Sequence, residues 1–269
     1  MKICKNCFSD KELKAFISLS ETIGDCEVCS SKNVNLIDLE ELLDFFQELI
    51  DNFQPYSTGE SLKSKIQGKW SFFSSLGIAT KILNKVLPKL STEILNSDSN
   101  VDYIDEINEN IKYWETLKEE LKWNRRFLTN TNLLEDLGWD SFFNTQFVLQ
   151  STDKMYRARV HHKAESPTYD QNEMMCPSKE IVGGGRANPL GIPYLYLCDN
   201  PETVLYEVRA SFLDELSVGI FKLKDSEVKT KIVDFTEDTS LFRIKKVNEI
   251  IKASLLRDKI SKDLSKPMR

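Results

Sequence analysis

The stretch from Met155 to Ala210 decides the fold of the C-terminal half of the chain, because short apolar runs alternate there with strong loop formers. It contains, in order, Met-Tyr-Arg-Ala-Arg-Val (155–160), Gly-Gly-Gly-Arg-Ala-Asn-Pro-Leu-Gly-Ile-Pro-Tyr-Leu-Tyr-Leu (183–197) and Asp-Asn-Pro-Glu-Thr-Val-Leu-Tyr-Glu-Val-Arg-Ala (199–210). Aromatic and β-branched runs bounded by breakers predict strands at 155–160 and 193–198. A loop as long as the one between them is more often a binding loop than filler.

A helix is predicted directly after the second strand. Asp199 or Asn200 can cap its N-terminus, and Pro201 suits its first position because a missing N–H costs least there. This helix places Glu207 in its second turn and Arg209 further along. An arginine on the first strand, a tyrosine on the second strand and a glutamate on the helix are therefore candidates for one site.

Three ordered motifs in this stretch resemble the RES domain, a family named for its Arg, Glu and Ser. They are Tyr-Arg-Ala-Arg (156–159), Gly-Arg-Ala-Asn-Pro-x-Gly-Ile-Pro-Tyr-Leu-Tyr-Leu (185–197) and Glu-Thr-x-Leu-x-Glu-Val-Arg (202–209). RES proteins are bacterial toxins that degrade NAD and have a fold similar to that of ADP-ribosyltransferases. The resemblance covers residues 150–269, and it implies an NAD-degrading toxin of a toxin–antitoxin or defence system.

The resemblance also implies roles for single residues. Arg157 and Glu207 match the family arginine and glutamate and are the expected catalytic residues, while Tyr196, Arg186 and Tyr156 are expected to bind NAD. During cleavage of the nicotinamide–ribose bond, an arginine can hold phosphate oxygens and an aromatic ring can stack on a base. A carboxylate can stabilise the cation that develops on the ribose. The sequence does not decide between water and phosphate as the acceptor.

Each of these residues also has an ordinary structural interpretation. Arg157 could pair with a surface carboxylate, and Arg186 could stabilise a turn. Tyr196 could pack within a strand, and Glu207 could be a solvated helix residue. Their joint occurrence in the family's order favours the site.

The family serine has no counterpart in this sequence. The chain stops at Arg269, where similar proteins continue through a helix and a serine-bearing strand. The RES domain is therefore expected to be incomplete at its C-terminus. The alternative is a catalytically inactive relative that acts as a binding or regulatory protein. A weaker alternative is ADP-ribosyl transfer to a macromolecule.

Two Cys-x2-Cys pairs near the N-terminus predict a structural zinc site. Cys4 with Cys7 and Cys26 with Cys29 supply four of the six cysteines, and each pair fits a tight turn that aims two thiolates at one tetrahedral ion. A closed four-thiolate site leaves no open position, so the metal would build a fold rather than catalyse. Two disulfides or four free thiols are the alternatives.

The expected fold class is α+β, with an N-terminal zinc-binding α-helical domain followed by a mixed α/β, ADP-ribosyltransferase-like RES domain. The expected domains are a zinc-knuckle unit (1–35), a helical domain (36–148) and the RES domain (149–269). Apolar periodicity and breakers predict the following elements: helices at 11–18, 38–53, 78–86, 101–123 and 248–256, strands at 218–223 and 231–235, a break at 54–59 and a polar linker at 96–100.

The helical block resembles the HEPN-like N-terminal domain of such toxins. Its ribonuclease members carry a histidine, whereas both histidines of this chain, His161 and His162, lie outside the block. A ribonuclease would therefore have no general base there. A regulatory or oligomerising role is expected instead.

The composition is that of an ordinary globular chain, with 269 residues, 41% apolar and 29% charged. The net charge of −6 argues against a nucleic-acid groove as the main surface. No run of 18 apolar residues exists and Met-Lys-Ile-Cys does not begin a signal peptide, so no membrane partner is expected and the cytoplasm is the expected location. The expected partners are NAD, a cognate antitoxin and a second copy of the chain.

Overall fold

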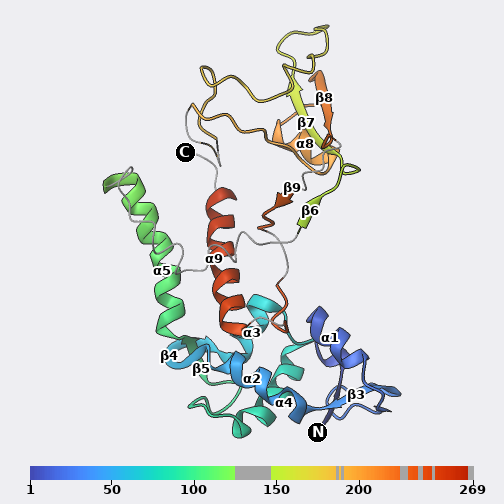
Figure 1. Cartoon of the computed structure of the whole chain (residues 1–269), viewed down its shortest axis with the longest axis vertical. Coiled ribbons are helices and arrows are strands. Elements are labelled where there is room, and N and C mark those ends of the chain that lie inside the picture. Colours follow the sequence, from blue (N-terminus) through green and yellow to red (C-terminus); the bar gives the residue numbers. More distant parts are fainter. Residues whose placement is uncertain are drawn as a thin grey trace. The chain divides into compact units, whose positions relative to one another are not determined.

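The computed structural model describes residues 1–124, 147–185, 188, 191–224, 230–235, 239–243 and 246–265. It is a mixed structure of helices and small antiparallel sheets, and it forms two compact units (Figure 1). Unit 1 comprises Met1–Phe143 and Phe235–Ile260, and unit 2 comprises Asn144–Asp234 and Ser261–Arg269. Residues 235–260 were expected in the C-terminal domain, but they belong to the same unit as the N-terminus.

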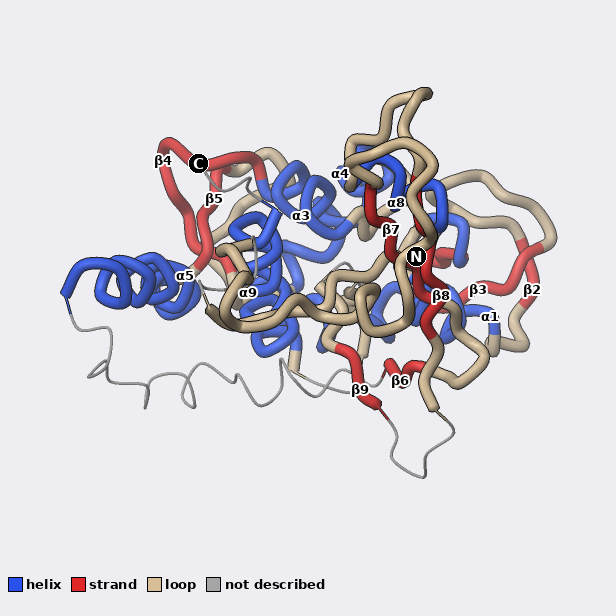
Figure 2. The backbone as a smooth tube through the Cα atoms, turned by 90° about the horizontal axis from the view of Figure 1, so that it is seen from above, coloured by secondary structure: helices blue, strands red, loops and turns tan. Residues whose placement is uncertain are grey.

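Unit 1 contains short strands among helices. In chain order they are β1 (Lys2–Cys4), η1 (Lys5–Cys7), α1 (Lys11–Ser18), β2 (Ile23–Gly24), β3 (Val34–Asp38), η2 (Leu39–Leu42), α2 (Leu43–Ile50), β4 (Phe53–Ser61), α3 (Leu62–Trp70), α4 (Leu76–Val86), η3 (Leu87–Lys89), β5 (Asn100–Tyr103), α5 (Asp105–Glu119), the π-helical turn η4 (Glu120–Asn124) and α9 (Val247–Ser265). The part of α9 after Ile260 is assigned to unit 2. The strands form a three-stranded antiparallel sheet of order β1-β3-β2 and a separate antiparallel ribbon of β4 and β5 (Figure 2).

The first helices of unit 1 follow the sequence prediction. Helix α1 has the predicted bounds, and the Asp10 side chain caps it by accepting from the amide of Leu13. The predicted helix at 38–53 is present as η2 and α2, and Asp38 with Glu41 forms the expected capping box at its start. Helix α4 begins two residues before the predicted start and ends where predicted.

Two predictions for unit 1 are correct only in part, for the same reason. The predicted break at 54–59 falls within β4, where it appears as a register shift between Pro55 and Glu60. The helix predicted at 101–123 begins as α5 only at Asp105, and its first residues form β5. Val101 and Tyr103 are buried, and Phe53 faces Tyr103 across the ribbon with stacked rings. Local propensity therefore yields here to pairing with a distant strand. Gly59 permits the approach, since a Cβ at this position would lie 2.2 Å from the carbonyl oxygen of Val101.

The core of unit 1 includes residues from the end of the chain. Leu241 and Ile251 are completely buried in the same apolar cluster as Phe46 and Phe72, which come from the N-terminal segment. The ring of Phe242 lies between residues of two helices, with its centroid 5.3 Å from that of Phe16 and 5.2 Å from that of Phe45.

Ion pairs join α9 to two helices of the N-terminal segment, α3 and α5. Asp258 pairs with Lys69 of α3, while Lys252 and Lys259 pair with Glu106 and Glu115 of α5. Figure 1 shows the three helices. The carboxylates of these pairs are exposed, so each pair contributes little to stability. The packing of α9 against the N-terminal segment is stabilised mainly by its apolar face, because burial of apolar side chains makes the dominant favourable contribution to the free energy of folding.

The Asp10 carboxylate connects the N-terminal segment to the residues before α9. It is buried, and it accepts hydrogen bonds from the Leu13 amide at 3.0 Å, the Ser240 hydroxyl at 2.6 Å and the Leu241 amide at 2.8 Å. A buried carboxylate is tolerated only when donors surround it in this way. Asp10 therefore fixes both the start of α1 and the return of the chain after unit 2.

Unit 2 contains β6 (Phe147–Leu149), β7 (Met155–Val160), α8 (Pro201–Glu207), β8 (Leu216–Phe221) and β9 (Thr230–Ile232). Its described strands form two antiparallel ribbons, β6 with β9 and β7 with β8 (Figure 2). In the second ribbon, Arg157 lies opposite Gly219 and Arg159 lies opposite Ser217.

The segment 155–210 adopts most of its predicted elements. Strand β7 has the predicted bounds, and α8 begins at Pro201 with the Asn200 side chain as its cap. The second predicted strand is reduced to one pairing, between Tyr156 and Cys198. The prediction for Arg209 is wrong, because α8 ends at Glu207 and Arg209 has a φ of 52°, outside the helical region.

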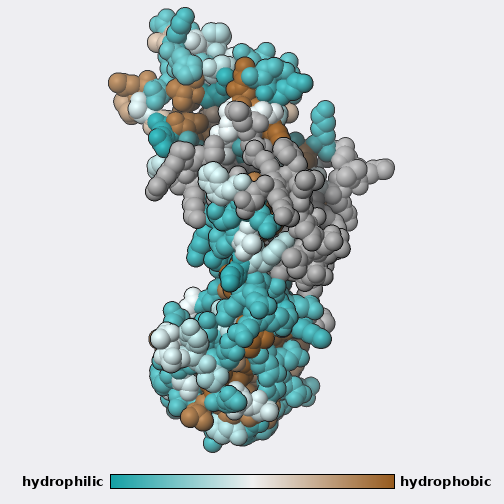
Figure 3. Space-filling model, turned by 90° about the vertical axis from the view of Figure 1, so that its left-hand side faces the viewer, coloured by the Kyte–Doolittle hydropathy of each residue, from teal (hydrophilic) through white to brown (hydrophobic). Residues whose placement is uncertain are grey.

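No helix in the described part of the chain is both long and apolar enough to cross a membrane. On the face drawn in Figure 3, hydrophilic residues cover most of the described surface and hydrophobic residues form small patches.

Replacement of Asp10 by alanine tests the connection between the chain's distant segments. We expect Asp10→Ala to lower the free energy of unfolding of unit 1 by about 3 kcal/mol, because buried amides lose their acceptor. Ser75→Ala is the matched control, since Ser75 caps α4 and makes no such long-range bond, and should cost about 1 kcal/mol. Urea denaturation measures both values. Hydrogen exchange in α9 should accelerate only in Asp10→Ala, and equal exchange in the two variants would contradict the role of Asp10.

Candidate functional site

The four N-terminal cysteines are positioned to hold a metal ion. The Sγ atoms of Cys4, Cys7, Cys26 and Cys29 all lie within 4.8 Å of one another. Between the two pairs, Cys4 and Cys29 are 3.4 Å apart and Cys7 and Cys26 are 3.5 Å apart. Tetrahedral coordination with metal–sulfur bonds of about 2.3 Å requires sulfur–sulfur separations of about 3.8 Å. A disulfide requires about 2.0 Å, and all four cysteines are free.

Backbone turns bring each pair to the cluster. Cys7 closes η1, which follows β1 directly. The turn after Cys26 is closed by hydrogen bonds from the Cys26 amide to the Ser31 carbonyl, at 2.8 Å, and from the Ser30 amide to the Cys26 carbonyl, at 3.1 Å. Ser30 has a φ of 61°, the left-handed conformation typical of such a tight turn. The Cys-x2-Cys spacing thus produces the geometry expected of it.

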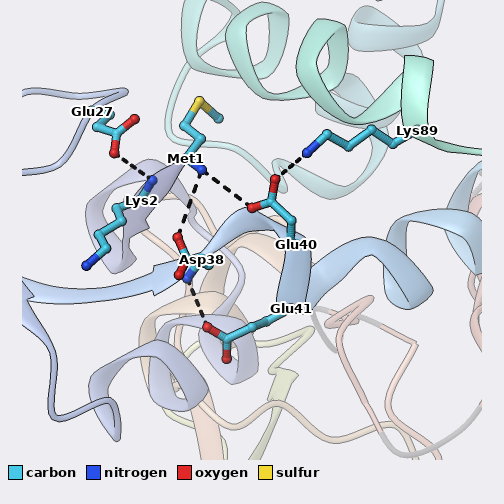
Figure 4. A network of polar contacts seen from close by, with 7 residues as sticks. All are labelled: Met1, Lys2, Glu27, Asp38, Glu40, Glu41 and Lys89. Atoms are coloured by element: carbon cyan, nitrogen blue, oxygen red, sulfur yellow. Dashed lines mark hydrogen bonds and ion pairs between the residues drawn. The ribbon is translucent and has the colours of Figure 1, made fainter.

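Polar contacts tie these turns to the rest of unit 1 (Figure 4). The Lys2 amide donates to the Glu27 carboxylate at 3.0 Å, and the Glu27 amide donates to the Lys2 carbonyl at 3.1 Å, which joins the second turn to β1. The N-terminal ammonium lies 3.4 Å from the Glu40 carboxylate, which also pairs with Lys89. The bond from Lys89 holds the pKa of Glu40 at about 2.

The thiols of the cluster differ in their readiness to ionise. Burial raises the pKa of Cys4 to about 11 and raises the pKa of Cys7 further. Burial also opposes ionisation of Cys29, but hydrogen bonds from the Ser31 hydroxyl and backbone outweigh it and lower the pKa of Cys29 to about 6. A cation bound by all four sulfurs must displace protons from the buried thiols, so its affinity falls as pH falls.

In unit 2, β7 organises the residues predicted to bind and cleave NAD. Tyr156 pairs with Cys198 through two backbone hydrogen bonds of 2.7 and 2.8 Å, which places the segment carrying Tyr196 beside β7. Helix α8, which ends at Glu207, packs against the same strand. Because side chains alternate along a strand, Tyr156 and Arg157 project from opposite faces of β7. The arrangement therefore groups Arg157 with Arg159 rather than with Tyr156.

The Arg157 guanidinium is half-buried and donates to the carbonyl oxygens of Met174, at 2.9 Å, and Met175. Burial lowers the pKa of Arg157, and the neighbouring charge of Arg159 lowers it further. Arg159 donates to the Glu173 carbonyl at 2.6 Å. Both arginines of β7 thus hold the same loop, a role that the sequence analysis missed for Arg159. Its place two residues after Arg157, on the same strand face, is the signal that could have indicated it.

The Tyr196 hydroxyl closes a loop. It donates to the Asn188 side chain at 2.6 Å, and the Asn188 amide group donates to the carbonyls of Gly183 and Ile192 at 3.1 and 3.0 Å. The Tyr196 ring remains about half exposed. Gly185 permits this closure, because a Cβ there would lie 2.2 Å from the Asn188 oxygen and 2.7 Å from the Tyr196 hydroxyl.

Glu207 is exposed at the end of α8. Burial raises the pKa of the Cys198 thiol, and the negative charges of Glu207 and Asp199 raise it further, so Glu207 lies within electrostatic range of the segment paired to β7. Arg186 lies outside the described residues. Ser31 and Asn188, which support the cysteine cluster and Tyr196, were not singled out from the sequence, since a lone serine or asparagine carries no spacing signal.

Comparison of the chain with protein families, with curated proteins and with solved structures gave no match. The roles of Arg157, Tyr196 and Glu207 in NAD chemistry therefore stay predictions.

Metal analysis tests the cysteine cluster. We expect about one metal ion per chain in freshly purified, reduced protein, and loss of the ion together with a lower melting temperature of unit 1 in Cys26→Ser, because metal binding is coupled to folding. Cys176→Ser is the control, since Cys176 is exposed and outside the cluster. Elemental analysis that finds no metal in the wild type, or equal metal in both variants, would contradict the assignment.

A paired glycine substitution tests the loop closed by Tyr196. Gly185→Ala should break the bond between Tyr196 and Asn188 and make residues 183–196 more sensitive to proteolysis, because the added methyl group collides with both side chains. Gly183→Ala should leave the loop unchanged, since a Cβ there meets no atom within 4 Å. Equal cleavage rates in the two variants would show that the closure is not needed to hold the loop.

Proposed function

We propose that unit 2 degrades NAD by cleaving the nicotinamide–ribose bond, and that the chain is the toxin of a bacterial toxin–antitoxin or defence system. The observation that carries the proposal is the contiguity of three elements: β7 with Arg157, the segment with Tyr196 paired to it, and α8, which packs on β7 and ends at Glu207. These elements hold the three motifs that resemble the RES family, in the family's order.

The reaction needs little covalent catalysis. As the C–N bond breaks, its electron pair stays with the nicotinamide nitrogen, and positive charge develops on the ribose. Water or phosphate then adds to the ribose carbon and loses a proton. Glu207 would stabilise the cation and accept from ribose hydroxyls, while Arg157 would hold phosphate oxygens and the half-exposed ring of Tyr196 would stack on a flat base.

For the cysteine cluster we propose a structural zinc ion. Four thiolates in a buried, closed arrangement suit zinc and leave no position for a substrate. The metal would fix the N-terminal turns of unit 1, which resembles the helical domain that precedes the RES domain in similar toxins. A toxin that consumes NAD must be inhibited in the cell that produces it, so this function implies a cognate antitoxin as a partner.

A non-catalytic binding or regulatory protein is the second candidate, and a specific observation favours it. Arg157 donates to two backbone carbonyls and the Tyr196 hydroxyl donates to Asn188, so both side chains already hold loops in place. In such a protein the motifs would preserve a fold rather than a reaction.

The decisive measurement is the release of nicotinamide when purified protein is incubated with NAD. We expect release by the wild type and a rate at least about 10²-fold lower in Glu207→Gln, the scale of losing one electrostatic contact to the transition state. Glu202→Gln, in the first turn of the same exposed helix, is the charge-matched control and should retain the rate.

No release by the wild type would favour the binding protein, and a fully active Glu207→Gln would show that another group stabilises the cation. Label from NAD retained on a protein or nucleic acid would identify transfer of ADP-ribose instead.

A further inference from the structure

The segment Asp170–Met175 lies over the face of β7 that carries two arginines. Its three consecutive carbonyls, those of residues 173, 174 and 175, accept the hydrogen bonds of Arg157 and Arg159. Met174 is buried, and its side chain lies against Gly219, the residue opposite Arg157 in the β7–β8 ribbon. The remaining residues of the segment are exposed.

The two guanidinium groups have no carboxylate partner among the described residues. They are two positions apart on one strand, which places their Cα atoms about 6.6 Å apart on the same face. Arg159 also lies over the Tyr169 ring, with 4.1 Å from its Cζ to the ring centroid. Within the described part of the chain, these two half-buried positive charges contact neutral carbonyls and a ring and form no ion pair.

The segment is held together by its own hydrogen bonds. The Asp170 amide donates to the Glu173 carboxylate, and the Glu173 amide donates to the Asp170 carboxylate, both at 2.8 Å. The Met174 amide donates to the Asp170 carbonyl at 3.1 Å. This reciprocal turn aims the three carbonyls at the arginines. Met174 is the one side chain of the segment that is buried.

We propose that Arg157 and Arg159 together bind the diphosphate group of a dinucleotide, and that the segment Asp170–Met175 closes this site by occupying both guanidinium groups with its own carbonyls. The identity of the dinucleotide as NAD rests on the proposed function. Phosphate oxygens carry full negative charge and accept stronger hydrogen bonds from arginine than carbonyls do. A diphosphate can also meet both guanidinium groups at once, and so competes with the segment directly.

Closure reduces the apparent affinity by the fraction of molecules in which the site is open. Weakening the segment without touching the arginines should therefore tighten anion binding. The test is calorimetric titration of the full chain with inorganic pyrophosphate. We expect the double variant Asp170→Ala with Glu173→Ala to bind about tenfold more tightly than the wild type, the gain that follows if about one molecule in ten is open in the wild type.

The matched control is the double variant Asp170→Asn with Glu173→Gln. It removes the same two negative charges but keeps an acceptor for each backbone amide, so the turn persists and the affinity should stay within about twofold of the wild type. In the alanine background, Arg157→Ala or Arg159→Ala should lower the affinity at least about tenfold. Arg209→Gln, an exposed arginine on the same unit, should not.

Hydrogen exchange keeps the result interpretable if a variant folds poorly. The amides of Met174 and Met175 should exchange faster in the alanine pair, while those of β7 keep their protection. An equal gain in both double variants would overturn the closure, because charge removal alone would explain it. Absence of pyrophosphate binding in every variant, or full binding without the arginines, would overturn the site itself.

The outcomes separate this inference from the proposed function. If pyrophosphate binds as expected but no nicotinamide is released from NAD, the proposed function is contradicted and the diphosphate site is supported. The opposite result is also possible to recognise. If the wild type and the alanine pair release nicotinamide at the same rate at subsaturating NAD, and neither binds pyrophosphate, the proposed function stands and the diphosphate site is contradicted.

Discussion

The hydrogen bonds accepted by one buried carboxylate, that of Asp10, are the constraint on which unit 1 depends. The carboxylate caps α1, between the two cysteine turns, and binds the Leu241 amide 231 residues later in the chain. Its burial is tolerated only while all its donors are in place. Correct placement of α1 and docking of the residues that lead into α9 are therefore one event, and the apolar face of α9 then completes the core.

The sequence predicted best the elements whose causes are local. Caps and apolar periodicity placed α1, α4 and α8, and a breaker-bounded apolar run placed β7. The sequence did not predict β4 and β5, because each forms a strand only by pairing with the other. Neither segment has a sequence feature that identifies its partner. The packing of α9 against the N-terminal segment could not be predicted for the same reason, since its partner residues are distant in the sequence.

The two candidate sites were predictable to different degrees. The cysteine cluster follows from spacing alone, since two tight turns fix four sulfur atoms once a sheet brings the turns together. The surroundings of Arg157 do not, because its partners are the backbone carbonyls of Met174 and Met175. Every residue has a backbone carbonyl, so no side-chain pattern identifies such a partner. Hydrogen bonds from arginine side chains to backbone carbonyls can be recognised only in the three-dimensional structure.

The larger part of unit 2, Asn144–Asp234, lies in the sequence between the two segments of unit 1, which has a consequence for synthesis on the ribosome. Residues up to Phe143 emerge first, but the core they form lacks Leu241 and the apolar face of α9 until residues 235–260 follow. At roughly 5–20 residues per second, translation of residues 144–234 in between takes on the order of ten seconds. Throughout that interval the nascent N-terminal segment exposes apolar surface that residues 235–260 cover in the finished protein, and this surface is open to chaperones until those residues emerge.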